Sequence, residues 1–105
     1  MKMMKRMGVL LLAGLPGLSQ AADGAALYRQ HCVKCHGADG RAATWRGYLY
    51  FARDLGNARW QAAQEDADLR TAIAEGPGLM PAYRDRLSAA ETEALVLHLR
   101  SLRRP

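Results

Sequence analysis

The sequence predicts a helical fold because three separate stretches show helical signals. Apolar residues recur at helical spacing within residues 23–34, within residues 66–75, and from Ser88 toward the C-terminus. With 105 residues, half of them apolar, the chain has the composition of one small globular domain rather than of a disordered segment. A hydrophobic core of this size is marginally stable by itself, so we expect another group to fill part of it.

The first 21 residues have the three parts of a secretory signal. Basic residues precede a short apolar run at residues 9–18, and small residues then mark a cleavage site after Ala21. We therefore expect a signal peptide at 1–21 and a mature domain at 22–105. An uncleaved anchor is the alternative, although glycine and proline interrupt the apolar run. Loss of the three basic residues lowers the formal net charge from +5 to +2, so nothing indicates a nucleic-acid partner.

The first helix is predicted over residues 23–34. Asp23 is a typical N-cap residue, and Leu27 and His31 then recur one helical turn apart on one face. Two glycines within residues 37–40 end this pattern, so we expect the chain to turn there.

Residues 41–64 contain most of the aromatic side chains of the protein. We expect a loop with a short helical turn in this stretch, because no long helical pattern runs through it. The aromatic residues concerned are Trp45, Tyr48, Tyr50, Phe51 and Trp60.

The second and last helices are predicted from the residues at their ends. The second helix, residues 66–75, stops at Gly76, because glycine suits the left-handed position that follows a helix. An extended loop follows at residues 78–81. Ser88 and Glu91 form a capping box that opens the last helix. The inner face of this helix is expected to consist of Leu95, His98, Leu99 and Leu102.

Cys32, Cys35 and His36 form a C-x-x-C-H motif, which is typical of covalent c-type haem attachment. Two thiols at this spacing can add to the two vinyl groups of one haem, and the adjacent histidine supplies an axial nitrogen to the iron. A C-x-x-C pair alone would also suit a redox dithiol or half of a zinc site. The added histidine therefore predicts one covalently bound haem c per chain.

Met80 is the expected second iron ligand. The other methionines lie in the predicted signal, so Met80 is the only one in the mature domain, and it lies in a loop rich in glycine and proline. A single methionine is otherwise most often a core residue. His31 and His98 are the competing ligands, but His31 adjoins Cys32 and cannot easily reach the opposite face of the haem.

Taken together, the chain resembles a class I c-type cytochrome, a small monohaem protein. The resemblance implies an all-α cytochrome c fold in which the first and last helices cross and the haem is wrapped by helices and the methionine loop. We also expect residues 41–64, with their aromatic side chains, to pack over one edge of this haem. Besides the attachment motif, the residues that carry the resemblance are Asp23-Gly24, Tyr28, Leu69, Ile73, Gly78-Leu79-Met80-Pro81-Ala82-Tyr83, Leu87-Ser88, Leu95-Val96 and Leu99.

The chain departs from the family pattern in two places. The family packs a small residue of the first helix against an aromatic residue of the last; Gly24 matches the small residue, but His98 stands at the aromatic position. The family also has a proline after the motif, whose carbonyl accepts a hydrogen bond from the ligating histidine, and residues 38–50 contain none. We expect another carbonyl in this stretch to serve His36, or the reduction potential to differ.

Two further residues, Trp60 and Arg53, resemble residues that contact the haem propionates in this family. The alternative is that Trp60 is an ordinary core residue and that Arg53 is simply solvated. Of these possibilities, contact of Trp60 and Arg53 with the haem propionates is the one that would give the two residues a role in cofactor binding.

The resemblance implies a one-electron carrier that shuttles electrons between periplasmic redox proteins. Two axial ligands leave no open iron position for a substrate, so we do not expect an enzyme. The partners are expected to be periplasmic or membrane-bound redox proteins, and the chain to be a monomer. An acidic partner could be steered by surface arginines, although a solvated helix end is the alternative. The arginines concerned are Arg84 and Arg86, or Arg100, Arg103 and Arg104.

Three other functions stay open at this stage. The chain could be an accessory cytochrome dedicated to one oxidoreductase, such as a cytochrome cd-type nitrite reductase system, for electron delivery or maturation. A haem peroxidase would require Met80 to detach, and no acid–base group is evident near it. A haem-free protein would use a disulfide between Cys32 and Cys35, or a metal bound with His36, but no fourth zinc ligand lies within reach in the sequence.

Overall fold

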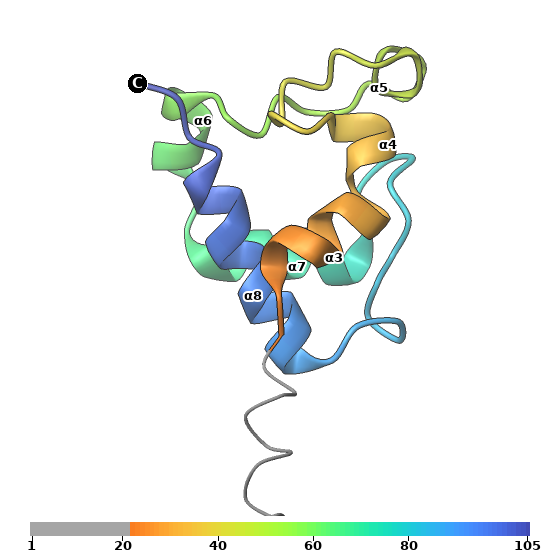
Figure 1. The fold of residues 1–105 in the computed structure, drawn as a ribbon, viewed down its shortest axis with the longest axis vertical. Helices are drawn as coiled ribbons and strands as arrows, with labels where there is room; N and C mark the ends of the chain where they lie inside the picture. Colours follow the sequence, from red (N-terminus) through yellow and green to blue (C-terminus); the bar gives the residue numbers. More distant parts are fainter. Residues whose placement is uncertain (1–21) are drawn as a thin grey trace, which may run out of the picture.

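The computed structural model describes residues 22–105, which are built from helices joined by loops (Figure 1). No strand occurs among these residues, so the all-α prediction is confirmed. No helix in this range has the length and apolar character that crossing a membrane requires. The predicted signal peptide lies outside the described residues. The helices are α3 (Gly24–His31), α4 (Val33–His36), α5 (Trp45–Leu49), α6 (Ala58–Ala63), α7 (Asp66–Glu75) and α8 (Ala89–Ser101).

The predicted first helix is divided into two in the structure. Asp23 caps α3 as expected, because its side chain accepts a hydrogen bond from the amide of Ala26. The continuous helix predicted to residue 34 is wrong: Cys32 has a φ of −116°, outside the α-helical range, and separates α3 from α4. The attachment motif therefore forms a helical turn of its own, in which the amide of His36 donates to the carbonyl of Cys32 over 2.9 Å.

α3 and α8 cross at Gly24, as the resemblance implied (Figure 1). A Cβ atom at residue 24 would overlap the carbonyl oxygen of Ala94, so only glycine allows the two backbones to come this close. One turn further along α3, the imidazole of His98 packs on the ring of Tyr28, with 4.9 Å between the ring centroids. His98 therefore fills the aromatic position of the crossing with a flat ring of its own.

α7 has the predicted boundaries. It ends at Gly76, whose φ of 70° lies in the left-handed region that glycine adopts without strain. Its start carries a capping box between Glu65 and Asp68, which we did not predict. The capping box predicted for α8, between Ser88 and Glu91, is present in the structure.

Residues 41–64 form two short helices, α5 and α6, with a loop between them. Of the five aromatic side chains in this stretch, Trp60 is the one that packs against the core. The other four are exposed, up to 87% for Phe51. The hydrophobic core itself consists of Tyr28, Leu55, Leu69, Ile73, Tyr83, Leu95, Val96 and Leu99.

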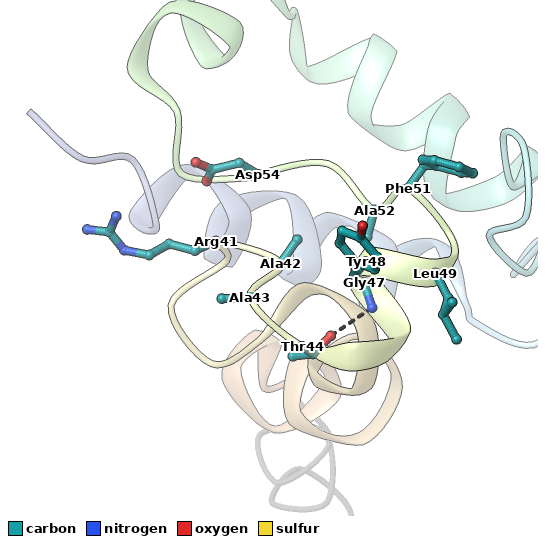
Figure 2. Close-up of a pocket in the computed structure, with 10 residues that line it drawn as sticks. All are labelled: Arg41, Ala42, Ala43, Thr44, Gly47, Tyr48, Leu49, Phe51, Ala52 and Asp54. Atoms are coloured by element: carbon teal, nitrogen blue, oxygen red, sulfur yellow. Dashed lines mark hydrogen bonds between the residues drawn. The ribbon is translucent and has the colours of Figure 1, made fainter.

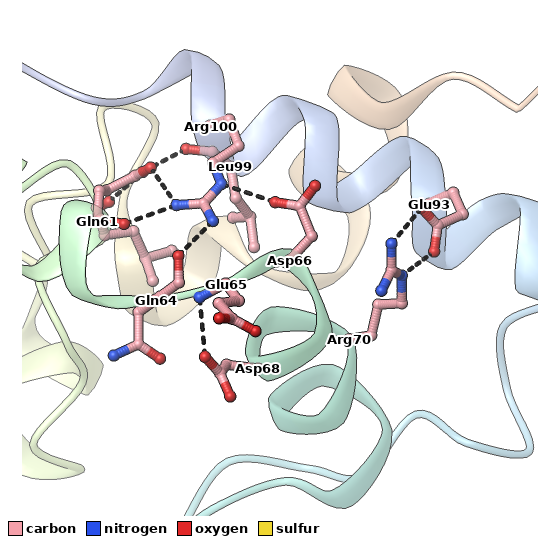
Figure 3. A network of polar contacts seen from close by, with 10 residues as sticks. Gln61, Gln64, Glu65, Asp66, Asp68, Arg70, Glu93, Leu99 and Arg100 are labelled. Carbon is pink, nitrogen blue, oxygen red and sulfur yellow. Dashed lines mark hydrogen bonds and ion pairs between the residues drawn. The ribbon is translucent and has the colours of Figure 1, made fainter.

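A polar network that the sequence did not indicate joins α6, α7 and α8 (Figure 3). The buried amide of Gln61 donates to the carbonyls of Leu55 and Leu99, over 2.8 and 2.6 Å. The guanidinium of Arg100 then donates to the carbonyl of Gln61 over 2.8 Å and to the carboxylate of Asp66 over 2.9 Å. Because these bonds satisfy groups on three elements, the network fixes α6 against the end of α8.

Candidate functional site

The attachment motif presents two thiols, Cys32 between α3 and α4 and Cys35 within α4. Cys32 and Cys35 are both partly buried, and Cys32 packs against the core. Burial, and secondarily the nearby Cys35, raise the pKa of Cys32 to about 11. Both thiols are therefore held beside each other at the edge of the core, where they are available for covalent attachment.

His36 is held in one orientation by a backbone carbonyl. Its Nδ1 lies 2.9 Å from the carbonyl oxygen of Arg53. Since a carbonyl can only accept, Nδ1 must carry the proton and Nε2 keeps its lone pair. Burial lowers the pKa of His36, which also favours the neutral imidazole, although the bond to Arg53 opposes this effect. The side chain thus has the form in which a histidine binds iron.

The carbonyl of Arg53 takes the place of the missing family proline. We expected such a carbonyl within residues 38–50, whereas the structure places it three residues beyond that stretch. A carbonyl belongs to every residue, so no sequence signal distinguishes Arg53 in this role. Only the folding of the loop around α5 brings it to His36.

α5 is fixed against the attachment motif by its first turn. The hydroxyl of Thr44 donates to the carbonyl of Cys35 over 2.7 Å and accepts from the amide of Gly47 over 2.8 Å, which caps the helix (Figure 2). A Cβ atom at residue 47 would overlap the carbonyl oxygen of Cys35. At the other end of α5, Phe51 has a φ of 56°, and the amide of Ala52 donates back to the carbonyl of Gly47 over 2.9 Å. This turn leads the chain to Arg53.

Gly37, the residue after the motif, is also anchored by a side-chain hydrogen bond to its carbonyl. The hydroxyl of Tyr28 donates to the carbonyl of Gly37 over 2.6 Å. Burial of the phenol raises the pKa of Tyr28, so the group stays protonated and keeps its donor role. Both ends of the segment that carries His36 are therefore tied to the folded core.

Met80 lies in a tight loop between α7 and the segment that leads to α8. The side chain is partly buried and packs against the core. The loop closes over Gly76, where a Cβ atom would lie 2.5 Å from the carbonyl oxygen of Met80 and 2.7 Å from the amide of Ala82. The amide of Tyr83 then donates to the carbonyl of Ile73 over 3.0 Å and ties the loop to α7.

The two competing histidines are engaged elsewhere. His31 packs edge-on against the ring of Tyr83, with 5.2 Å between centroids, and His98 packs on Tyr28 in the helix crossing. Within residues 22–105 there is no group of three or more His, Cys, Asp or Glu side chains that could hold a metal ion. The haem-free metal site therefore gains no support.

Trp60 and Arg53, the two residues expected near the propionates, lie together. The guanidinium of Arg53 is exposed and stands over the ring of Trp60, 5.3 Å from its centroid. The carbonyl that orients His36 belongs to the same residue, so the segment that carries this cation contacts the candidate ligand. A cation beside an aromatic ring suits a carboxylate such as a haem propionate. Free thiols, an oriented imidazole and this cation together fit a covalently attached haem.

A hollow of about 710 Å³ lies beside this site, within the loop around α5 (Figure 2). Its walls contain none of the candidate ligands. The lining residues are Arg41, Ala42, Ala43, Thr44, Gly47, Tyr48, Leu49, Phe51, Ala52 and Asp54.

Comparison with known proteins gives consistent matches. Residues 19–99 match the family described as cytochrome c oxidase, cbb3-type, subunit III. Among curated relatives, the cbb3-type cytochrome c oxidase subunit FixPc of Rhizobium leguminosarum bv. viciae is 35% identical over 88 residues, covering 83% of this chain. Subunit FixP of Bradyrhizobium diazoefficiens is 32% identical over 94 residues, covering 87%. The chain spans only 29% and 31% of the lengths of these two relatives.

Solved structures give a similar picture. The KustC0563 c-type cytochrome has a TM-score of 0.74 and 38% sequence identity, and the match covers 78% of this chain and 99% of that one. A tyrosine-to-phenylalanine mutant of the same cytochrome has a TM-score of 0.71 at the same identity and covers 77% of this chain. At this identity the similarity concerns the sequence as well as the arrangement of helices.

Proposed function

The chain belongs to the family described as cytochrome c oxidase, cbb3-type, subunit III, and we propose that it is a one-electron carrier whose iron is bound by His36 and Met80. It is a c-type cytochrome and carries covalently bound haem c, whose iron changes between the ferric and ferrous states. We assign the two thioether bonds to Cys32 and Cys35. The chain's own residues would hold the group and orient its ligand.

The observation that carries this proposal is the hydrogen bond from His36 to the carbonyl of Arg53. It fixes the tautomer, so Nε2 is available as a ligand in either oxidation state without any proton transfer at Nδ1. A ligand that stays in place minimises rearrangement between the two states, as electron transfer requires.

Met80 is suited to the opposite axial position. A thioether stays uncharged, and a methionine ligand raises the reduction potential relative to a second histidine. The rigid turn over Gly76 holds the side chain against the core, so it does not swing freely into solvent. With both positions filled, the iron has no site for a substrate, which favours a carrier over a peroxidase. Trp60 and Arg53 are proposed to face the propionates.

An optical spectrum in both redox states is the direct test of this proposal. The protein would be produced in the periplasm of a host that attaches haem c. We expect sharp reduced α and Soret bands, and in the oxidised form the weak red band of an iron–thioether bond. Haem without that band, or rapid carbon monoxide binding by the reduced protein, would contradict Met80 as ligand. A protein without haem would refute the proposal as a whole.

We place the protein in the periplasm, exported by residues 1–21 and cleaved after Ala21. The charged start and short apolar run support this, as does the need to attach c-type haem outside the cytoplasm. The intact mass of purified periplasmic protein tests it. A mass that corresponds to residues 22–105 plus one haem is expected, whereas retention of the first 21 residues in the membrane fraction would indicate an anchor.

A second candidate is a cytochrome dedicated to one oxidoreductase, for electron delivery or for its maturation. The relatives named as cbb3-type oxidase subunits favour it, because they are subunits of one enzyme. The two functions differ in selectivity. A general carrier should exchange electrons with several redox proteins at similar rates, whereas a dedicated cytochrome should react with one oxidase or reductase at least tenfold faster than with the others.

A further inference from the structure

Most of the arginines that the sequence offered for steering a partner are engaged within the chain. Their ion-pair partners are Glu75 for Arg84, Asp66 for Arg100 and Asp54 for Arg104. Arg86 lies over the ring of Tyr83, 4.6 Å from its centroid. A cation already paired with a carboxylate attracts an approaching partner only weakly, so Arg84, Arg100 and Arg104 do not form a free basic surface.

Cations without an ion pair are more frequent in the part of the sequence that contains the attachment motif and α5. Residues 24–60 contain six Lys or Arg and two Asp or Glu, whereas residues 61–99 contain three and seven. Five cations in the first range make no ion pair within the described part of the chain. Residues 24–60 are therefore positively charged and residues 61–99 negatively charged. The five are Arg29, Lys34, Arg46, Arg53 and Arg59.

α5 and the turn after it add an apolar patch to this basic region. We call the set Trp45, Arg46, Tyr48, Leu49 and Phe51 the α5 surface. Its four apolar members are between 54% and 87% exposed. The guanidinium of Arg46 lies over the ring of Trp45, 5.0 Å from the centroid, and has no carboxylate partner in residues 22–105. Exposed aromatic residues with arginine are typical of the centre of a protein interface.

The α5 surface faces away from the attachment motif but lies directly behind it. Gly47 turns toward the carbonyl of Cys35, while Trp45 and Leu49, one turn apart, lie on the opposite side of the helix. Thr44 connects the start of α5 to the same carbonyl. A protein seated on this surface would be separated from Cys35 by a single short helix, which keeps the path for an electron short.

We propose that the α5 surface is the docking site for a redox partner protein whose electron-exchange site is surrounded by acidic residues. This inference rests on the proposed carrier function and names the chemistry of the partner. Acidic side chains would meet Arg46, while the aromatic rings would cover apolar area at the centre. A second copy of the chain is disfavoured as the occupant, because two copies would bring Arg46 against Arg46.

Stopped-flow reduction by flavodoxin hydroquinone tests the docking site, since flavodoxin is an acidic one-electron protein. One electron passes from the flavin, which goes from anionic hydroquinone to neutral semiquinone, to the iron, which goes from ferric to ferrous. No proton is exchanged. At low ionic strength we expect Arg46→Glu to slow this reaction about tenfold or more and to flatten its salt dependence. Trp45→Ser should slow it at high ionic strength as well.

Arg103→Glu is the matched control, because it makes the same charge change at the far end of α8. It should slow the reaction less than twofold. If Arg46→Glu and Arg103→Glu slowed the reaction equally, only the net charge of the protein would matter. If Arg46→Glu and Trp45→Ser both reacted at the wild-type rate, the partner would bind elsewhere. Either result overturns the proposal. Reduction by hexaammineruthenium(II), which needs no docking, must stay unchanged in all variants. Failure of that reaction in the wild type would refute the carrier function itself.

A binding measurement that involves no electron transfer completes the test. The mature domain has two tryptophans, Trp45 on the α5 surface and Trp60 in the core region, so its two indole N–H signals report on separate places. Addition of oxidised flavodoxin should shift the Trp45 signal and leave the Trp60 signal in place. A shift of neither signal would contradict docking at α5. Concentration-dependent dimerisation that Trp45→Ser abolishes would assign the surface to self-association instead.

Discussion

At the scale of single residues, His36 depends on a backbone atom that lies far along the chain. Its Nδ1 donates to the carbonyl of Arg53 because α5 and the turn at Phe51 fold the chain back to the motif. Phe51 adopts a positive φ, which costs a residue with a side chain about 1 kcal/mol. The ligand orientation is therefore maintained by a loop that carries some strain, and not by the motif alone.

Met80→Ala should lower the reduction potential and open the iron to added ligands. Loss of the thioether removes the ligand that favours the ferrous state, so we expect a decrease on the order of 0.1 V or more, within the roughly 0.8 V range that axial ligands cover. Voltammetry measures the potential, and carbon monoxide binding to the reduced variant reports the open position.

His98→Phe is the control for this substitution, because His98 packs on Tyr28 in the helix crossing. It should leave the potential and the iron–thioether band unchanged. If His98→Phe abolished that band while Met80→Ala kept it, the assignment of the ligand would be wrong.

At the scale of helices, the crossing of α3 and α8 is set by the lack of a side chain at residue 24. In an ordinary helix, replacing glycine with alanine stabilises by up to about 1 kcal/mol. Here the added Cβ atom would overlap the carbonyl oxygen of Ala94 and crowd the Cβ of His98 at 3.2 Å. We therefore expect Gly24→Ala to lower the free energy of unfolding by about 1–3 kcal/mol, the usual cost of overpacking.

Urea unfolding of the haem-loaded protein measures the change in the free energy of unfolding caused by Gly24→Ala. A decrease confirms the close approach of α3 and α8. Gly78→Ala is the comparison, because no atom lies within 4 Å of a Cβ at that position and only its φ of 59° opposes the change. A stabilised Gly24→Ala variant would mean that the two helices do not approach as closely as described.

The loop before α6 is tied to the C-terminal segment by Asp54 and Arg104, whose ion pair spans 2.5 Å. The hydrogen bond from Arg104 holds the pKa of Asp54 below its ordinary value of 3.8. A lowered folded-state pKa stabilises the fold above the unfolded value, and this contribution is lost as the pH falls through the folded value. Wild-type stability should therefore fall more steeply below about pH 4 than that of Asp54→Asn.

Urea midpoints at about pH 6 and about pH 3 measure this difference. Haem ligation also weakens in acid, but it does so in both proteins and cancels in the comparison. Arg104→Gln removes the other partner and should reduce the pH dependence as Asp54→Asn does. Identical slopes in all three proteins would show that the pair does not contribute.

At the scale of the whole molecule, local signals predicted much of the helical frame and the motifs of the site. Asp23, Gly76 and Ser88 act through neighbours a few residues away, so their caps and helix ends could be identified from the sequence. The carbonyl of Arg53 and the network of Gln61 could not, because both depend on groups brought together from distant segments. The break at Cys32 also lacked a local signal.

The network around Arg100 shows why an exposed helix end does not identify a docking surface. The sequence offers the arginines after residue 99 as possible steering groups, yet Arg100 donates to four groups on α6, α7 and the loop between them. Arg100→Ala should therefore destabilise the fold by about 2 kcal/mol, since hydrogen bonds from a charged donor are among the stronger ones. Its rate of reduction by flavodoxin should stay within twofold of the wild type.

Arg103→Ala helps to decide whether the C-terminal arginines stabilise the fold or steer a partner. Arg103 is exposed and has no ion pair within residues 22–105. It should change the free energy of unfolding by less than about 0.5 kcal/mol. Equal stability of the two variants in urea, together with a slower reaction in Arg100→Ala, would return Arg100 to the partner surface. The opposite pattern means that Arg100 holds α6, α7 and α8 together and is not a steering group, which leaves Arg46 on the α5 surface as the cation that an acidic partner meets.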